Sequence, residues 1–317
     1  MTLGFYELKM NGLRIISHGG ADTLFNTELY LVPDKGIGIF VSYSGGEGAT
    51  AAVGLSKTFF DRYYPLKDVD LPLSTGELQD SVNKYSGFYQ FTRRNHSDID
   101  KFYSFMSQIS IAVLDNRLTI GSGPEQLVYA PVETNLFQEV GGTSQIGFRT
   151  DTSGEVTHLL LDFLPSMPLE RAPLINQSKF WFTLIGISSF LFITVLLGFV
   201  YRKREIKVMP KEQKWFIRLS LVTSVWALLS LVVTFVVVLN MDLLDRLSRI
   251  TPELSIYLVM PIILITLTVA MIISSFFIWK NSYWTLLKRV HYTLVALSAL
   301  ITCLFYYHWN LIGWQFG

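Results

Sequence analysis

From residue 180 onward, long apolar runs alternate with short polar connections. A helix that spans a bilayer needs about 20 consecutive apolar residues. Four runs reach this length, and because lipid offers their backbone amides no other partner, we expect four transmembrane helices. The runs are Phe180–Tyr201, Leu219–Leu239, Ile256–Trp279 and Val290–Leu311. Residues 173–317 are therefore predicted to form a four-helix transmembrane region.

The connections between these runs differ in charge. The second connection has Arg246 and Arg249 offset by three acidic residues. The third has Lys280, Lys288 and Arg289, and the first has seven basic residues: Arg202, Lys203, Arg204, Lys207, Lys211, Lys214 and Arg218. Positively charged loops remain in the cytoplasm. We therefore expect the loops 202–218 and 280–289 to be cytoplasmic and residues 1–179 to be extracytoplasmic.

Residues 1–64 show short β-type runs followed by one helix. The runs Phe5–Met10 and Leu13–His18 flank Asn11-Gly12, a strong hairpin signal. Two further runs, Leu29–Val32 and Ile37–Ser42, are joined by a turn that contains Pro33 and Gly36, and Ala49–Tyr63 has helical spacing. A meander closed by one helix is small for an independent domain. We expect it to be the C-terminal part of a larger α/β sheet, with its other face covered by further sequence.

Residues 65–79 are polar and contain proline, which is typical of a linker. Short β-type runs then recur up to residue 172, and eight closely spaced strands predict a small antiparallel, lipocalin-like β-barrel. A barrel of this size either holds a small ligand or is filled by side chains, and the pattern leaves both open. The eight runs are Gly87–Thr92, Phe102–Met106, Ile109–Leu114, Arg117–Ile120, Gln126–Val132, Leu136–Val140, Gln145–Arg149 and Val156–Phe163.

Composition narrows the classes of function. Half of the 317 residues are hydrophobic and 16% are charged, which argues against an all-soluble protein. A formal net charge of +1 gives no electrostatic footprint for nucleic acid. The four apolar runs make the lipid bilayer the expected partner. The single cysteine, Cys303, excludes an intramolecular disulfide and a thiolate zinc site. His96 and His158 have no ligand partners at metal spacing, and we expect neither metal nor cofactor.

The first residues, Met1–Phe5, lack the basic start, the long apolar run and the cleavage site of a signal peptide. Export of a domain ahead of the first membrane span is difficult without such a signal. We therefore expect this chain to be a fragment of a longer gene product.

Several segments of residues 1–64 together resemble one family. They are Gly4-Phe5-Tyr6, His18-Gly19-Gly20, Phe25-Asn26-Thr27, Leu31-Val32-Pro33 and Gly38-Ile39-Phe40-Val41-Ser42-Tyr43-Ser44. The pattern resembles the C-terminal end of the catalytic domain of serine β-lactamase-related hydrolases. These include class C β-lactamases, penicillin-binding proteins, D-aminopeptidases and related esterases. The β domain and the helical tail that follow resemble the layout of membrane-bound members.

The resemblance implies roles for four residues. His18-Gly19-Gly20 occupies the place of the family's third motif, on the strand that lines the active site. Its first residue helps to bind a substrate carboxylate, and the glycines let the substrate backbone approach the strand. The backbone N–H of Ala21 matches the second donor of the oxyanion hole. The substrates implied are a cell-wall peptide, a β-lactam or an ester.

The chain departs from the family pattern in its nucleophile. The family uses the Ser of Ser-x-x-Lys, and a second motif of the Tyr-x-Asn type. Both normally precede the third motif by hundreds of residues, whereas 17 residues precede His18 here. One match, Ser81-Val82-Asn83-Lys84, follows His18 and is interpreted as a solvated turn or short helix before a strand.

Two functions follow from these observations. In the first, the chain is the C-terminal part of a membrane-anchored, extracytoplasmic serine hydrolase that forms an acyl-enzyme, and it is inactive alone because it lacks the nucleophile. In the second, it is a non-enzymatic membrane protein whose extracellular β domain binds a ligand or partner.

Overall fold

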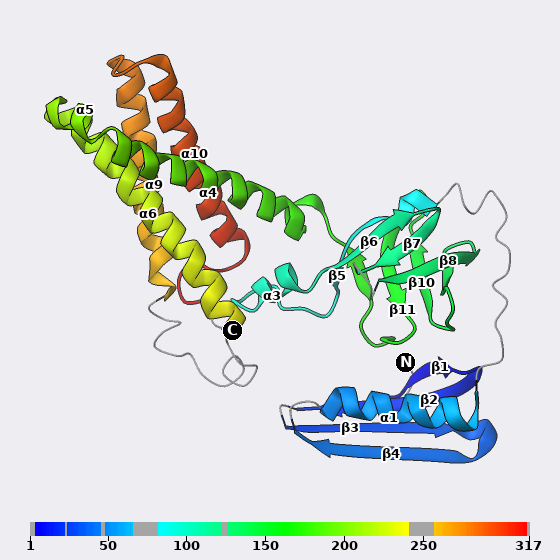
Figure 1. The fold of residues 1–317 in the computed structure, drawn as a ribbon. Coiled ribbons are helices and arrows are strands. Elements are labelled where there is room, and N and C mark those ends of the chain that lie inside the picture. Colours follow the sequence, from blue (N-terminus) through cyan, green and yellow to red (C-terminus); the bar gives the residue numbers. More distant parts are fainter. Residues whose placement is uncertain are drawn as a thin grey trace. The chain divides into compact units, whose positions relative to one another are not determined.

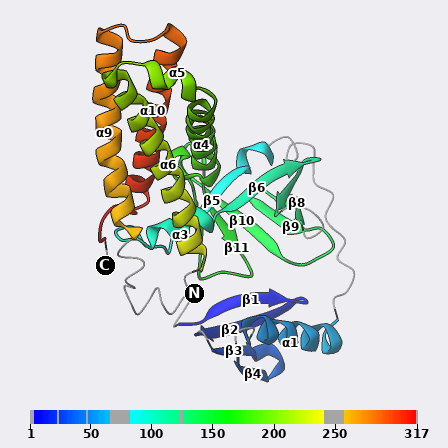
Figure 2. The same ribbon diagram turned by 60° about the vertical axis from the view of Figure 1, so that its left-hand side comes forward.

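The computed structural model describes residues 4–22, 24–45, 48–65, 82–121, 126–240 and 257–315. The chain divides into two compact units, one of residues 1–94 and 107–173, the other of residues 95–106 and 174–317. The first unit contains a four-stranded sheet and a barrel, and the second contains the long helices (Figures 1 and 2). Apart from Pro65, the predicted linker lies outside the described residues.

The sheet is an antiparallel meander in the order β1-β2-β3-β4. At the turn between β1 and β2, Asn11 and Gly12 have φ angles of 52° and 78°, which a type I′ hairpin turn requires, so the predicted hairpin is confirmed. Pro33–Lys35 forms one turn of 310 helix that ends at Gly36, in the left-handed region. The helix α1 spans Gly48–Tyr63, and the strands are β1 (Tyr6–Met10), β2 (Leu13–Ala21), β3 (Phe25–Val32) and β4 (Ile37–Ser44).

The helix α1 covers one face of this sheet. Ile15, Tyr30 and Val32 are buried with Phe60 of α1 in a small hydrophobic core. Side chains alternate between the two faces of a strand, so the neighbours of these residues point the other way. On that opposite face, Phe40 of β4 is 68% exposed. It lies beside Leu29 of β3, which in turn pairs with His18 of β2. The sheet therefore has one packed face and one open face. A larger sheet of the β-lactamase type is not part of the described structure.

The barrel is closed and antiparallel, in the order β10-β11-β12-β5-β6-β7-β8-β9, which confirms the prediction of eight strands around a barrel. A 310 helix, Val82–Tyr85, precedes it. Its strands are β5 (Gly87–Phe91), β6 (Ile109–Leu114), β7 (Arg117–Ile120), β8 (Leu127–Glu133), β9 (Leu136–Glu139), β10 (Gln145–Thr150), β11 (Val156–Leu161) and β12 (Leu169–Arg171).

One predicted strand is wrong and one strand was missed. The run Phe102–Met106 belongs to a helix, α3 (Lys101–Met106), and the barrel is closed instead by β12, which pairs with β11 and β5. The aromatic run has high β-propensity, but Phe102 and Phe105 are three residues apart and lie on one face of a helix. Both are buried in the core of the helical unit, and this burial outweighs the local preference.

The interior of the barrel is filled by side chains. Tyr89, Tyr129 and Phe137 are at most 1% exposed, and the ring of Tyr85 lies 4.6 Å from that of Phe148. Of the two alternatives that the sequence left open, the structure shows the packed core.

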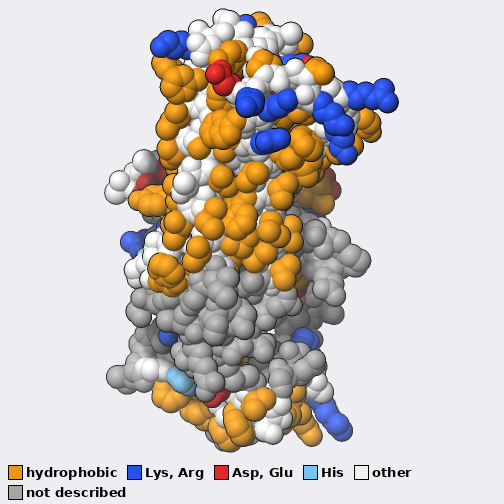
Figure 3. Space-filling model, turned by 90° about the vertical axis from the view of Figure 1, so that its left-hand side faces the viewer, with side chains coloured by type: hydrophobic (Ala, Val, Ile, Leu, Met, Phe, Trp, Pro, Cys, Tyr) orange, Lys and Arg blue, Asp and Glu red, His pale blue; other side chains and the backbone are white. Residues whose placement is uncertain are grey.

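The helical unit contains, among its described residues, four helices that are long and apolar enough to cross a membrane. This confirms the predicted multi-pass membrane region. The helices are α4 (Ser178–Tyr201), α6 (Lys211–Asn240), α9 (Val259–Lys280) and α10 (Leu286–His308), and a short helix α5 (Lys203–Val208) joins α4 to α6. Figure 3 shows a band of hydrophobic side chains along these helices and Lys and Arg side chains gathered at one end.

Candidate functional site

The segment His18-Gly19-Gly20-Ala21 ends strand β2. Its residues pair with Leu29, Glu28, Thr27 and Asn26 of β3, in that order. Because Ile15 lies on the face that α1 covers, alternation places Gly19 and Ala21 on that face and His18 and Gly20 on the open face. Of the three residues with a substrate-binding role in the resemblance, His18 and Gly20 are thus on the open face, whereas Gly19 is on the covered face.

The surroundings of His18 on the open face are apolar and hydroxylic. His18 is exposed and lies in register with Leu29 and Phe40, and the ring of Phe5 lies edge-on at 6.0 Å from the imidazole. Two residues further along β2, on the same face, Gly20 lies opposite Thr27, whose hydroxyl is 3.5 Å from the carbonyl oxygen of Gly20. An exposed imidazole beside apolar side chains suits a substrate with one anionic and one apolar part.

The backbone N–H of Ala21 points outward from the β2–β3 pair. The N–H of Asp22 donates to the carbonyl of Phe25 over 2.8 Å. Donors along an antiparallel ladder alternate in direction, so the N–H of Ala21 is directed away from β3. No described residue pairs with Ala21 on that side. An oxyanion-hole donor is a backbone N–H of this kind, directed away from its paired strand.

Glu28 is the group that the sequence analysis did not use. It lies opposite Gly19 on the face that α1 covers, and a Cβ at Gly19 would collide with its carboxylate. Burial raises the pKa of Glu28 above its ordinary value of 4.5, although a hydrogen bond from Tyr6 and the nearby His18 oppose this shift. The position of Glu28 in the sequence was the available signal. Asn26 and Tyr30, two residues before and two residues after it on β3, are both buried, so alternation turns Glu28 toward the same covered face.

Ser81 lies outside the described residues. The rest of its Ser-x-x-Lys match belongs to the 310 helix Val82–Tyr85, whose two apolar ends are buried in the barrel core. The ammonium group of Lys84 lies 4.9 Å from the ring centre of Tyr85, a cation–π contact. Lys84 thus has a structural contact in the barrel.

The other titratable candidates are dispersed. His158 Nδ1 lies 3.0 Å from the hydroxyl of Thr157 in β11, and the backbone oxygen of His96 accepts a hydrogen bond from Asn310. Within the described part of the chain, no three His, Cys, Asp or Glu side chains are grouped so that they could hold a metal ion.

No family model and no curated protein matches this chain. Among solved structures, it is similar at 14% identity to a crystal structure of SurE with D-Leu, with a TM-score of 0.30 over 54% of this chain and 38% of that one. A second structure of SurE gives a TM-score of 0.29, over 54% of this chain and 37% of that one, at 14% identity. The octameric penicillin-binding protein homologue from Pyrococcus abyssi gives 0.20, over 50% and 33%, at 14% identity. The chain spans less than two thirds of the length of each of these proteins. At these TM-scores the likenesses carry no argument about fold or activity.

Proposed function

We propose that residues 4–64 form one wall of the active site of an extracytoplasmic serine hydrolase of the β-lactamase-related kind, and that α4, α6, α9 and α10 anchor it in the membrane. The reaction is acyl transfer: a serine hydroxyl attacks the carbonyl carbon of a peptide, β-lactam or ester. The leaving group departs, and water or another nucleophile then releases the acyl group from the serine.

One observation carries this proposal. On a single strand, β2, His18 and Gly20 face the uncovered side of the sheet, and the adjacent N–H of Ala21 is directed away from β3. His18 binds the substrate carboxylate, Gly20 allows the substrate backbone to approach, and Ala21 stabilises negative charge on the attacked carbonyl. The open face, with Phe40 exposed, and the outer edge of β4 offer surfaces on which the remainder of a catalytic fold can pack.

The extracytoplasmic location rests on the direction of the helices. The basic residues 202–218 follow the end of α4, and positively charged loops stay in the cytoplasm. The opposite end of the helical unit holds the start of α4, where Ser178 donates to the carbonyl of Phe105, and the end of α10. Residues 1–173 precede α4 along the chain, so we assign them to the side of the membrane on which α4 starts.

Covalent labelling tests the proposal. Because no Ser-x-x-Lys or Tyr-x-Asn motif precedes His18, we expect the 317 residues alone to remain unlabelled by fluorescent penicillin and by fluorophosphonate probes. Translation of the nucleotides upstream of the Met1 codon should reveal both motifs in frame, and the complete product should be labelled on that serine. Labelling of the 317-residue chain at Ser81 contradicts the assignment.

The role of His18 needs a separate test in the complete product. We expect His18→Ala to lower kcat/KM for a substrate with a free carboxylate by about 10- to 100-fold, the loss typical of one charged or hydrogen-bonding contact in a site. His96→Ala is the matched control, since His96 lies in the helical unit. Equal activity of the two variants argues against a substrate-binding histidine.

The second function is that of a non-enzymatic membrane protein whose extracellular β domain binds a ligand or partner. A ligand inside the barrel has little support, because the interior is occupied by the side chains of Tyr89, Tyr129 and Phe137. This alternative therefore reduces to a partner bound on the outer surface of the barrel.

A further inference from the structure

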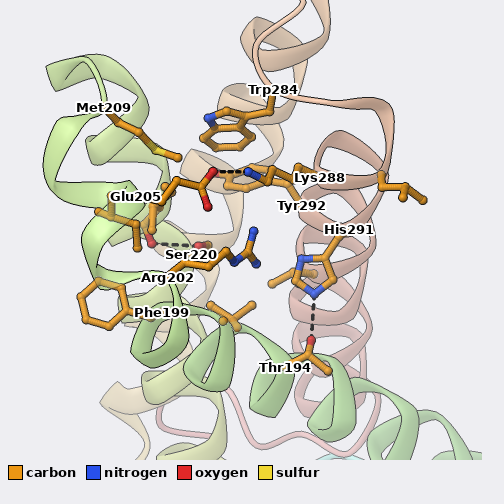
Figure 4. A pocket seen from close by; sticks show the side chains of 16 residues that line it. Thr194, Phe199, Arg202, Glu205, Met209, Ser220, Trp284, Lys288, His291 and Tyr292 are labelled. Atoms are coloured by element: carbon orange, nitrogen blue, oxygen red, sulfur yellow. Dashed lines mark hydrogen bonds and ion pairs between the residues drawn. The ribbon is translucent and has the colours of Figure 1, made fainter.

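A cavity of about 330 Å³ opens within the helical unit, between the ends of α4 and α5, the start of α6 and the start of α10 (Figure 4). Its volume falls in the range that binds small molecules. One part of its lining is basic, with Arg202, Lys288 and His291, and another part is apolar, with Val195, Phe199 and Val295. The cavity is therefore amphipathic.

The basic part carries more positive than negative charge. Lys288 forms an ion pair with Glu205, the one acidic residue of the lining. Arg202 forms no ion pair with any carboxylate among the described residues, and Figure 4 shows its guanidinium pointing into the space between α4 and α10. His291 is held by a contact of 2.8 Å between its Nε2 and the hydroxyl of Thr194. An anion bound here has Arg202 available as a partner.

The position of Arg202 depends on a glycine. One turn earlier in α4, Gly198 lies directly beneath the guanidinium, and a Cβ at this position would come within 2.8 Å of Arg202 Nη2. The absence of a side chain at Gly198 lets the guanidinium lie against the helix and reach the cavity.

Trp284 lies at the edge of the cavity in an unusual backbone conformation. Its φ angle is 62°, in the left-handed region, which is rare for a bulky residue. Backbone strain of this kind is concentrated at functional sites. The indole N–H donates to the side-chain oxygen of Gln213 over 2.8 Å, and Tyr283 donates to Glu212 over 2.8 Å. These two hydrogen bonds hold the loop before α10 against the first turn of α6, and the indole of Trp284 lines the cavity.

The cavity lies where the membrane spans end. Arg202 directly follows the span Ser178–Tyr201, and Lys288 stands in the first turn of the span Leu286–His308. Tryptophan and basic residues at span ends lie at the level of the lipid headgroups. Basic pockets between transmembrane helices on the cytoplasmic side bind anionic headgroups.

We propose that this cavity binds an anionic phospholipid, with the phosphate on Arg202 and the first carbons of an acyl chain against Val195 and Val295. A free phosphate ion shares the headgroup chemistry but has no apolar group that could contact the apolar part of the lining. The site is separate from the proposed hydrolase site and does not depend on it.

The test measures lipid binding to the detergent-solubilised 317-residue chain by native mass spectrometry. Phosphatidylglycerol, phosphatidylcholine and inorganic phosphate are the three probes. We expect phosphatidylglycerol to bind at least tenfold more tightly than phosphatidylcholine, and millimolar phosphate not to displace it. Arg202→Gln should weaken phosphatidylglycerol binding about tenfold. Lys203→Gln, the matched control, removes the same charge one residue away from the cavity lining and should change it less than twofold.

A second variant keeps every charge in place. Gly198→Ala should displace the guanidinium of Arg202 and weaken phosphatidylglycerol binding several-fold, with an unchanged melting temperature by tryptophan fluorescence showing that the helices remain folded. Equal binding of the two lipids, equal losses in Arg202→Gln and Lys203→Gln, or displacement by inorganic phosphate would overturn the proposal.

Discussion

The ring of Phe105 lies 5.2 Å from the indole of Trp309, although Phe105 follows the barrel strand β5 along the chain and Trp309 directly follows the last transmembrane helix. The same segment adds polar contacts: Lys101 Nζ donates to the carbonyl of His308 over 2.5 Å, and Asn310 donates to the carbonyl of Asp98 over 3.1 Å. Residues 95–106 thus close one end of the helical unit, and the chain passes between the two units three times.

Loss of the Phe105 ring should destabilise the helical unit. Phe105→Ala removes a side chain that is 1% exposed, and such truncations typically cost about 3–5 kcal/mol. All seven tryptophans, from Trp181 to Trp314, belong to the helical unit, so tryptophan fluorescence during heating reports its melting alone. Met106→Ala is the control, because Met106 is 41% exposed on the same helix. Equal melting temperatures for the two variants would contradict the packing role.

Glu170 should make the barrel less stable in acid. Burial opposes ionisation of Glu170, but hydrogen bonds from Arg94 and Gln90 outweigh it and hold its pKa below the ordinary value of 4.5. A depressed pKa contributes stability above the unfolded pKa, and this contribution is lost as the pH falls through the folded value. At pH values below about 4.5, hydrogen exchange corrected for intrinsic rates should show that barrel peptides become less protected as the pH decreases.

In Glu170→Gln, this decrease in the protection of barrel peptides at low pH should be smaller. Glu155→Gln serves as the control, because the carboxylate of Glu155 is 78% exposed and 3.9 Å from Arg171. An acid profile of Glu170→Gln that coincides with that of the native chain would exclude the ion pair as its cause.

Glu28 should have the opposite pH dependence. Its folded pKa is raised above 4.5 by burial, so its contribution to stability is complete below the unfolded pKa and is lost as the pH rises through the folded value. We expect peptides of the sheet to lose protection as the pH increases above about 4.5, and Glu28→Gln to remove most of this loss. Glu7→Gln is the control, since Glu7 is half exposed and paired with Arg14 at 2.8 Å. A profile unchanged in Glu28→Gln would rule out this carboxyl as the titrating group.

Gly19 and Glu28 should be energetically coupled. Gly19→Ala places a methyl group against the Glu28 carboxylate, which ends a flexible side chain and can move aside, so we expect a cost of about 1 kcal/mol, the low end for overpacking. In the Glu28→Ala background the same substitution should cost clearly less, which a double-mutant cycle measures from chemical unfolding. Thr27→Ala is the control background, because Thr27 lies on the other face. An effect of Gly19→Ala that is the same in all three backgrounds would show that the two residues are not coupled.

The orientation of the helices can be read from cysteine labelling. Cys303 is the only cysteine and is buried, so Cys303→Ser gives a background without thiols. In intact cells, Thr152→Cys in an exposed barrel turn should react with a membrane-impermeant maleimide, and Lys203→Cys should react only after permeabilisation. The reverse pattern would place the barrel and the proposed hydrolase wall in the cytoplasm.

The residues of the candidate site were identifiable from the sequence, but their arrangement was not. The motif at His18 was found through its resemblance, and Glu28 stood out only as a charged residue at an inward-facing strand position. Which face His18 occupies depends on where α1 packs, and the direction of the N–H of Ala21 depends on the register between β2 and β3. The cavity beside Arg202 combines residues from four helices, and no local pattern contains that combination.

By itself, the sequence determined the elements whose cause is local. Four apolar runs are long enough to span a bilayer, and the Asn11-Gly12 turn and strict alternation define the first hairpin, because periodicity and turn chemistry act over a few residues. Only the tertiary structure decided that Phe102–Met106 is a helix, that Leu169–Arg171 closes the barrel and that aromatic rings fill it. In these cases burial against residues far along the chain outweighs local preference, and the partners that supply it are defined only once the chain has folded.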